Sequence, residues 1–156
     1  MRGPVRSAQS RWLLSCAAAL LALAGAEAAT AVDEVILVAN NTVSDTSITR
    51  QAAQDAFLGK KNTWSDGASV VLATLSEGET HDKFLLAFVG RTASQFSTYW
   101  KKLVFSGKAM EPKSFDTEES LLKFVSETKG AVGYVSAKSA ENKDAMAGCK
   151  VLTIAK

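Results

Sequence analysis

The stretch Phe57-Leu-Gly-Lys-Lys-Asn-Thr-Trp-Ser-Asp-Gly67 decides how the chain is read, because it joins a helix-like segment to a strand-like one. Gly59 is placed to end the helix, since only glycine enters the left-handed backbone region without a steric cost. The closing Asp-Gly pair is a turn signal before the apolar run that begins at Val70. Trp64 puts a large ring in the connection, where it is expected to anchor the loop to the core. The stretch therefore predicts a helix, a pinned loop and a strand.

Strands and helices alternate outward from this loop. Short apolar runs bounded by turn residues predict strands at 35–39, 70–75, 131–136 and 151–155. Helices are expected after the caps Ser47, Thr92 or Ser94, and Asp116, with a further helix ending near Gly90. Residues 137–148 predict a short helix or a loop. This order favours an α/β sandwich around a mixed, mostly parallel sheet flanked by helices.

The clearest amphipathic pattern is the apolar stripe of the third expected helix, from Ala93 to Val104. It contains Tyr99 and Trp100. These rings could stack on a cofactor, but at this spacing we expect them in the core. No cofactor is therefore expected.

The first 28 residues have the pattern of a secretory signal peptide. Arginines come first, an apolar run rich in leucine and alanine follows from Trp12 to Ala24, and small residues then precede a cleavage site placed after Ala28. An uncleaved membrane anchor is the alternative. A lipoprotein signal at Cys16 is weaker still, because the apolar run before it is short. The expected organisation is a signal peptide at 1–28 and one exported domain at 29–156, periplasmic or secreted by a bacterium.

Composition limits the partners of that domain. Without the signal peptide the formal charge falls to zero, with 15 basic and 15 acidic residues, so nothing favours nucleic acid or an anionic membrane. The remaining 128 residues suffice for one domain with its own core. Cys149 would be its single cysteine, without a disulfide, and is expected as a small buried hydrophobe. No second apolar span follows, so no membrane insertion is expected after cleavage.

Catalytic and metal chemistry find little support. His81 is the only histidine, and no serine or cysteine motif with catalytic spacing accompanies it. It could serve as a general base, but we expect a surface residue on a helix. One histidine and one cysteine cannot form a zinc shell without carboxylates. Phosphate-binding glycine motifs are absent from the sequence. We therefore expect a protein that is not an enzyme.

Binding is more plausible, because ligands of open α/β sheets lie beyond the carboxyl ends of the strands. Two loops qualify. One follows the first strand and contains Asn41 and Thr42, and the other follows the second strand and contains Ser76 and Thr80. Amides at the start of the next helix could hold an oxyanion there. The alternative is that Ser76 and Thr80 merely cap that helix.

Two motifs resemble phosphate ABC transporter substrate-binding proteins. The run from Ile48 through the Asn62-Thr-Trp-Ser-Asp-Gly67 loop is similar to that family's helix ending in Ile-Phe-x-Gly and its Asn-Trp-x-Asp-Gly-like loop. Gly130-Ala-Val-Gly-Tyr-Val135 is similar to its Gly-Ala-Ile-Gly-Tyr strand. The two motifs occur in the family's order, and the resemblance covers nearly all of residues 29–156. The resemblance implies a single lobe of a type 2 periplasmic-binding-protein fold, like the short relatives of the family.

The resemblance also implies a function. It predicts a non-enzymatic binding domain for phosphate or a similar small oxyanion, in ABC-type uptake or sensing, with Asn41, Thr42, Ser76 and Thr80 as the ligand-binding residues. An ABC permease or another envelope protein is the expected partner. The family's Arg-x-x-x-Ser-Gly-Thr-like run is matched here by 75–80, which has no arginine and carries Glu77 and Glu79. The alternative is an envelope protein-interaction module that has lost ligand binding.

Overall fold

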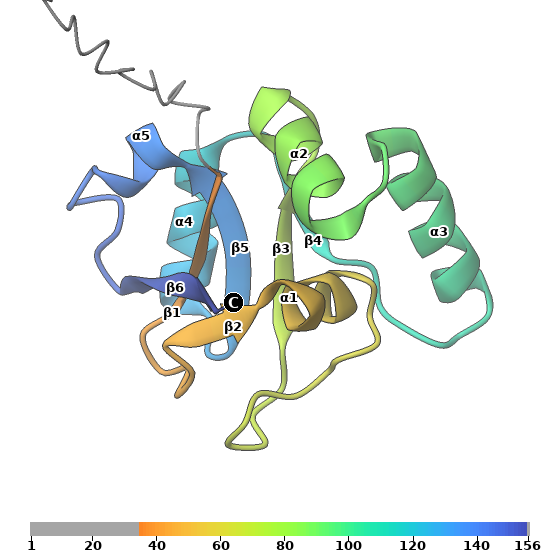
Figure 1. Cartoon of the computed structure of the whole chain (residues 1–156), viewed down its shortest axis with the longest axis horizontal. Helices are drawn as coiled ribbons and strands as arrows, with labels where there is room; N and C mark the ends of the chain where they lie inside the picture. The colour runs from red at the N-terminus through yellow and green to blue at the C-terminus, as the bar shows by residue number, and fades with distance from the viewer. Residues whose placement is uncertain (1–34, 156) are drawn as a thin grey trace, which may run out of the picture. The chain divides into compact units, whose positions relative to one another are not determined.

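The computed structural model describes residues 35–155. The expected signal peptide, 1–28, lies outside these residues. In chain order the elements are β1 (Val35–Asn40), β2 (Ser47–Thr49), α1 (Arg50–Phe57), β3 (Val71–Leu75), α2 (Glu79–Phe84), the π-helical segment η1 (Leu85–Val89), α3 (Ala93–Phe105), β4 (Lys113–Phe115), α4 (Glu118–Glu127), β5 (Ala131–Ser136), α5 (Ala137–Ala140) and β6 (Cys149–Ala155) (Figure 1).

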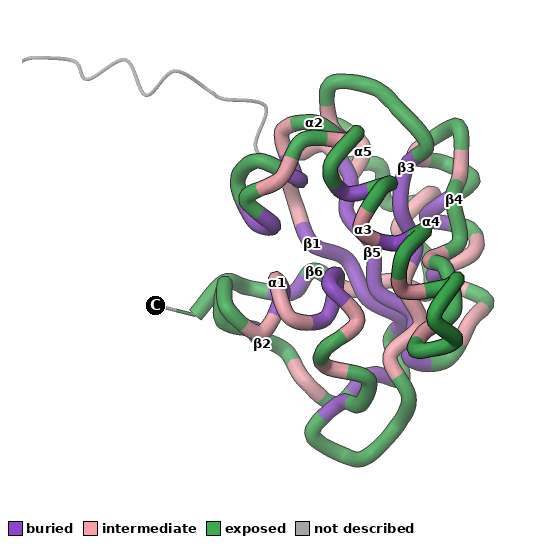
Figure 2. The backbone as a smooth tube through the Cα atoms, turned by 90° about the vertical axis from the view of Figure 1, so that its right-hand side faces the viewer, coloured by how far each residue is buried: buried purple, intermediate pink, exposed green. Residues whose placement is uncertain are grey.

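The strands form one sheet in the order β2-β6-β1-β5-β3-β4. The pairs β3–β4, β3–β5 and β2–β6 are parallel, whereas β1 is antiparallel to both of its neighbours, β5 and β6. Five strands therefore run one way and β1 runs the other. The predicted mixed, mostly parallel sheet is confirmed. Its central strands β1 and β5 carry the most deeply buried stretches (Figure 2).

Helices cover both faces of the sheet. Neighbouring residues of a strand point to opposite faces, so the contacts of Gly133 and Tyr134 in β5 show which helices lie on each face. Tyr134 of β5 packs against Phe57 of α1 and Phe84 of α2, with ring centroids 5.8 and 3.8 Å apart. The preceding Gly133 faces α4 so closely that an added Cβ would lie 2.7 Å from Leu121 Cδ2. Helix α4 thus covers one face, and α1 with α2 covers the other.

The loop between α1 and β3 is pinned as predicted. Trp64 is buried, and its indole Nε1–H donates to the carbonyl of Gly130 at 2.9 Å. Gly130 has a φ of +73°, and a Cβ at this position would lie 2.2 Å from the Ser69 carbonyl oxygen. Gly59 has a φ of +69° just after the end of α1, where the sequence predicts the helix to stop. The loop and the start of β5 therefore form one packed unit.

Local corrections concern short strands and caps. Ser47, expected as a cap, lies in the edge strand β2, and Thr49 caps α1 by accepting from the Ala52 amide. Thr117 rather than Asp116 caps α4. Strands β2 and β4 have three residues each, too few to show a periodic pattern in the sequence.

Candidate functional site

The carboxyl ends of β3, β4 and β5 meet at one edge of the sheet, because these three strands are parallel. Ser76 follows β3 directly. Its amide donates to the Phe115 carbonyl at 2.8 Å, and its hydroxyl donates to Asp116 Oδ1 at 2.9 Å. The chain then turns at Gly78 into α2. This edge therefore gathers polar groups from two segments that are distant in the sequence.

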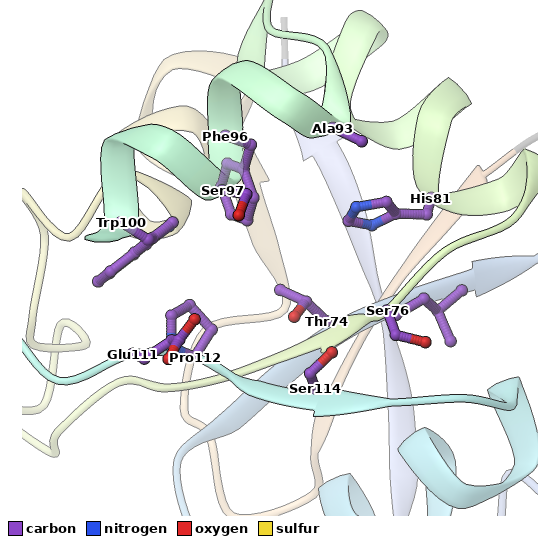
Figure 3. Close-up of a pocket in the computed structure, with 11 residues that line it drawn as sticks. Thr74, Ser76, His81, Ala93, Phe96, Ser97, Trp100, Glu111, Pro112 and Ser114 are labelled. Atoms are coloured by element: carbon purple, nitrogen blue, oxygen red, sulfur yellow. The ribbon is translucent and has the colours of Figure 1, made fainter. Parts of the chain in front are cut away.

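A cavity of about 140 Å³ opens beside this edge, between α3 and the strands β3 and β4. Figure 3 shows residues of α3 on one side, Thr74 and Ser114 of the strands on the other, and His81 across from Trp100. Four hydroxyl-bearing residues line it, and they are Thr74, Ser76, Ser97 and Ser114. Glu111 is the one carboxylate in the lining, which contains no lysine or arginine. The cavity thus offers neutral hydrogen-bonding groups rather than positive charge.

The prediction that His81 lies on the protein surface is wrong. The residue is 4% exposed and lines the cavity from α2, instead of lying on the surface. Its Nδ1 lies 2.5 Å from the Tyr134 hydroxyl, which also accepts the Leu75 amide at 3.0 Å. His81 Nδ1 and the Tyr134 hydroxyl share one hydrogen bond, and the tautomer of the imidazole decides which of the two atoms donates. The ring is thereby fixed to the ends of β3 and β5.

The electrostatics of this pair favour neutral groups. Burial lowers the pKa of His81 and outweighs Asp82, whose negative charge acts to raise it. Burial also raises the pKa of Tyr134, against the effect of the hydrogen bond from the Leu75 amide. At neutral pH the cavity is therefore lined by an uncharged imidazole and an uncharged phenol behind it.

Thr80 is already engaged by a carboxylate of the same chain. Its hydroxyl donates to Glu118 Oε1 at 2.7 Å, and the amide and hydroxyl of Ser136 donate to Oε2 at 3.0 and 2.8 Å. Burial acts to raise the pKa of Glu118, but the hydrogen bonds from Ser139, Thr80 and Ser136 outweigh it, so the pKa lies below its usual value. An external oxyanion at Thr80 would have to displace this internal anion.

Asn41 and Thr42 lie at the opposite edge of the sheet. They follow β1, and β1 runs against β5 and therefore against β3. The side chain of the buried Asn40 holds their turn together, accepting from the amide and hydroxyl of Thr42 at 2.9 and 2.6 Å. Of the four predicted ligand-binding residues, only Ser76 lines the cavity. Thr80 lies in α2, which follows the same end of β3, and Asn41 and Thr42 lie at the opposite edge of the sheet.

The rings of Tyr99 and Trp100 pack against the core, as predicted. Trp100 is buried and donates to the Phe57 carbonyl at 3.2 Å, and Tyr99 donates to the Leu58 carbonyl at 2.7 Å, so both rings tether α3 to the end of α1. Cys149 is half-buried rather than fully buried as expected, and this burial raises the pKa of its thiol to about 11, as suits an unreactive cysteine. Within residues 35–155 no group of three or more His, Cys, Asp or Glu side chains is placed to hold a metal ion. The same residues contain no helix long and apolar enough to span a bilayer.

The fold is similar to solved structures of phosphate-binding proteins. A protein described as a phosphate ABC transporter substrate-binding protein from Clostridium perfringens, solved with bound phosphate, matches 77% of this chain with a TM-score of 0.58 and 17% identity. PstS from Borrelia burgdorferi matches 77% of the chain with a TM-score of 0.55 and 13% identity. An ABC-type phosphate transport receptor from Vibrio cholerae matches 77% with a TM-score of 0.50 and 14% identity.

The matched regions make up 44%, 46% and 45% of those three proteins, so this chain corresponds to less than half of each. The predicted fold, one lobe of a type 2 periplasmic binding protein, is confirmed by this similarity. No protein-family model matches the sequence, and no similar sequence was found among curated proteins.

Proposed function

We propose that this chain is an exported, non-enzymatic binding domain that holds a small oxyanion, phosphate first among them, for ABC-type uptake or sensing. The observation that carries the proposal is the cavity beyond the carboxyl end of β3, lined by hydroxyl groups and by the buried imidazole of His81. Neutral donors of this kind can surround an anion without a cation when several converge on it. The similarity to a phosphate ABC transporter substrate-binding protein and to an ABC-type phosphate transport receptor supports this ligand class.

Glu111 favours phosphate over sulfate as the ligand of the cavity. It is an acceptor in the cavity lining, and at neutral pH phosphate carries an O–H that can donate to a carboxylate, whereas sulfate carries none. We therefore expect phosphate to bind more tightly than sulfate. Affinity should be modest in either case, because a single lobe leaves the ligand open to water on one side.

Calorimetric titration with phosphate and then with sulfate, at low ionic strength, tests the proposal. We expect micromolar binding of phosphate that weakens about fivefold to tenfold in Ser76→Ala or His81→Gln, the value of about one hydrogen bond. Thr80→Ala should leave the affinity nearly unchanged, because the Thr80 hydroxyl donates to Glu118 and Thr80 is not among the residues that line the cavity. Asn41→Ala is the matched control, because Asn41 is exposed at the other edge of the sheet and should leave the affinity unchanged.

Two results would contradict the proposed binding of an oxyanion in this cavity. If a folded sample gives no heat with either anion, the capture hypothesis is wrong. If Asn41→Ala weakens binding as much as Ser76→Ala does, the ligand lies at the other edge of the sheet. Both variants keep the core residues, and their circular dichroism spectra should match the wild type.

The second candidate is an envelope protein-interaction module that has kept the fold of the lobe and lost the ligand. The observation that favours it is Glu118, whose carboxylate already uses the donors of Thr80 and Ser136. A neighbouring permease and ATPase gene would favour transport. A gene beside other envelope or sensor proteins would favour interaction.

A further inference from the structure

Helix α3 lines two separate recesses with different sets of residues. Ala93, Phe96, Ser97 and Trp100 line the cavity described above, while Ser94, Gln95, Thr98, Tyr99 and Lys102 line a separate groove. The two recesses share no lining residue. The groove is therefore a second candidate binding surface, separate from the cavity.

The groove lies between α3 and the end of α1 and has a volume of about 750 Å³. Gln54 and Leu58 belong to the wall opposite α3, and Val89 and Gly90 connect the two sides. This volume is in the range of pockets for organic ligands or peptide segments, and it far exceeds the needs of a small ion. The groove is thus a surface for an extended partner.

Its charge has one sign. Lys60, Arg91 and Lys102 line the groove, and no aspartate or glutamate does. Lys60 reaches Asp55 at 3.9 Å, at the limit of an ion pair. The guanidinium of Arg91 lies 4.9 Å from the centre of the Tyr99 ring, which holds it in place without neutralising it. Within residues 35–155, neither Arg91 nor Lys102 has a carboxylate partner.

An exposed apolar side chain lies on the helix face that Thr98 and Lys102 contribute to the groove. Thr98, Lys102 and Phe105 are spaced by four and three residues, so they lie on the same face of α3. Phe105 is 96% exposed and ends the helix. A partner along the groove would meet positive charges first and a bare aromatic ring at the end.

We propose that this groove, lined by Lys60, Arg91 and Lys102, together with the exposed Phe105 one turn beyond Lys102, binds an acidic segment of a protein partner that carries an apolar residue beside its carboxylates. Carboxylates would pair with the three cations, and the apolar residue would cover Phe105. A flat bilayer cannot reach the floor of a concave groove. Three cations are also few for a nucleic acid backbone. This inference does not rest on oxyanion binding in the cavity.

The test uses fluorescence anisotropy of a labelled peptide of alternating glutamate and leucine, with the same peptide carrying glutamine in place of glutamate. We expect the full chain to bind the acidic peptide and to ignore the glutamine version. Arg91→Gln and Lys102→Gln should each weaken binding about threefold, and added salt should weaken it further. Phe105→Ser should weaken binding of the leucine peptide and leave an all-glutamate peptide unaffected.

Lys143→Gln is the control, because Lys143 is an exposed lysine far from the groove in the sequence and outside its lining. Loss of binding in this variant equal to that in Lys102→Gln would overturn the proposal, since general charge attraction would then explain the affinity. Binding to anionic vesicles or to oligonucleotides in place of the acidic peptide would overturn it too. Circular dichroism of each variant separates loss of contact from loss of fold.

Discussion

At the scale of single residues, Glu118 is the most informative side chain. Its carboxylate joins Thr80 of α2 to Ser136 at the end of β5, so one anion fastens three segments at the candidate site. Hydrogen bonds to a charged acceptor are stronger than those between neutral groups. The same residue explains why Thr80 is a poorer candidate for ligand binding than the sequence suggests.

Glu118→Gln should destabilise the protein at neutral pH by about 1 kcal/mol, a modest value because solvent screens this partly exposed site. The pKa of Glu118 is lower in the folded state, so its stabilising effect is present above its unfolded pKa of about 4.5 and is lost as the pH falls through the folded value. Urea unfolding at neutral and acidic pH measures this. A variant that keeps the wild-type acid sensitivity over that range would contradict the assignment.

The hydroxyl of Tyr134 should contribute to the stability of the fold in addition to the packing of its ring. Tyr134→Phe leaves the buried Leu75 amide and His81 Nδ1 without their partner, and we expect a loss of about 2 kcal/mol in the free energy of unfolding. Tyr99→Phe is the matched control, because it removes one hydroxyl bond to the Leu58 carbonyl at a half-buried position and should cost about 1 kcal/mol. If denaturant unfolding gives the same loss of free energy for both variants, the two hydrogen bonds of the Tyr134 hydroxyl stabilise the fold no more than the single one of Tyr99.

His81 gives a pH signature that no other side chain type can supply, since it is the chain's only histidine. Burial lowers its pKa in the folded state, so the unfolded state binds the proton more readily. Stability should therefore decline as the pH falls from about 7 towards about 5, and this part of the decline should be absent in His81→Gln. Thermal unfolding across this range decides the question.

At the scale of elements, the junction between the loop after α1 and the start of β5 is the tightest point. Gly130→Ala would set a Cβ against the Ser69 carbonyl and force a left-handed backbone on alanine, so we expect a loss of about 3 kcal/mol. Gly67 has a similar φ of +83° and nothing within 4 Å of a Cβ. Gly67→Ala should therefore cost only about 1 kcal/mol, and a comparison of the two by chemical denaturation isolates the clash.

The sequence predicts the elements with strong periodicity and misses those without it. The apolar runs at β1, β3 and β5 and the stripe of α3 could be read directly, because each buries one face or both. The site was harder, since the reversed direction of β1 depends on pairings far apart in the chain. His81 could have been found: it precedes Phe84, Leu85 and Phe88 at helical spacing and so belongs to the buried stripe of α2.

At the scale of the whole molecule, Cys149 reports on global unfolding. It joins β6 to α4 through a contact of 3.4 Å between its Sγ and the Leu122 carbonyl, and burial raises the pKa of the thiol to about 11. We expect iodoacetamide at mildly alkaline pH to modify Cys149 slowly in the native protein and rapidly in denaturant. Peptide mass spectrometry distinguishes it from Cys16. Fast native labelling would show that β6 separates from α4 without global unfolding.

Helix α3 forms a wall of both recesses and is tied to the end of α1 by the hydrogen bonds of Tyr99 and Trp100. A shift of this helix on binding in one recess would therefore change the shape of the other. If both proposed ligands bind, such a shift would couple their affinities, and any factor by which the acidic peptide changes the affinity for phosphate would equal the factor by which phosphate changes the affinity for the peptide. A small lobe could in this way convert the presence of an ion into a change in the partner that it holds.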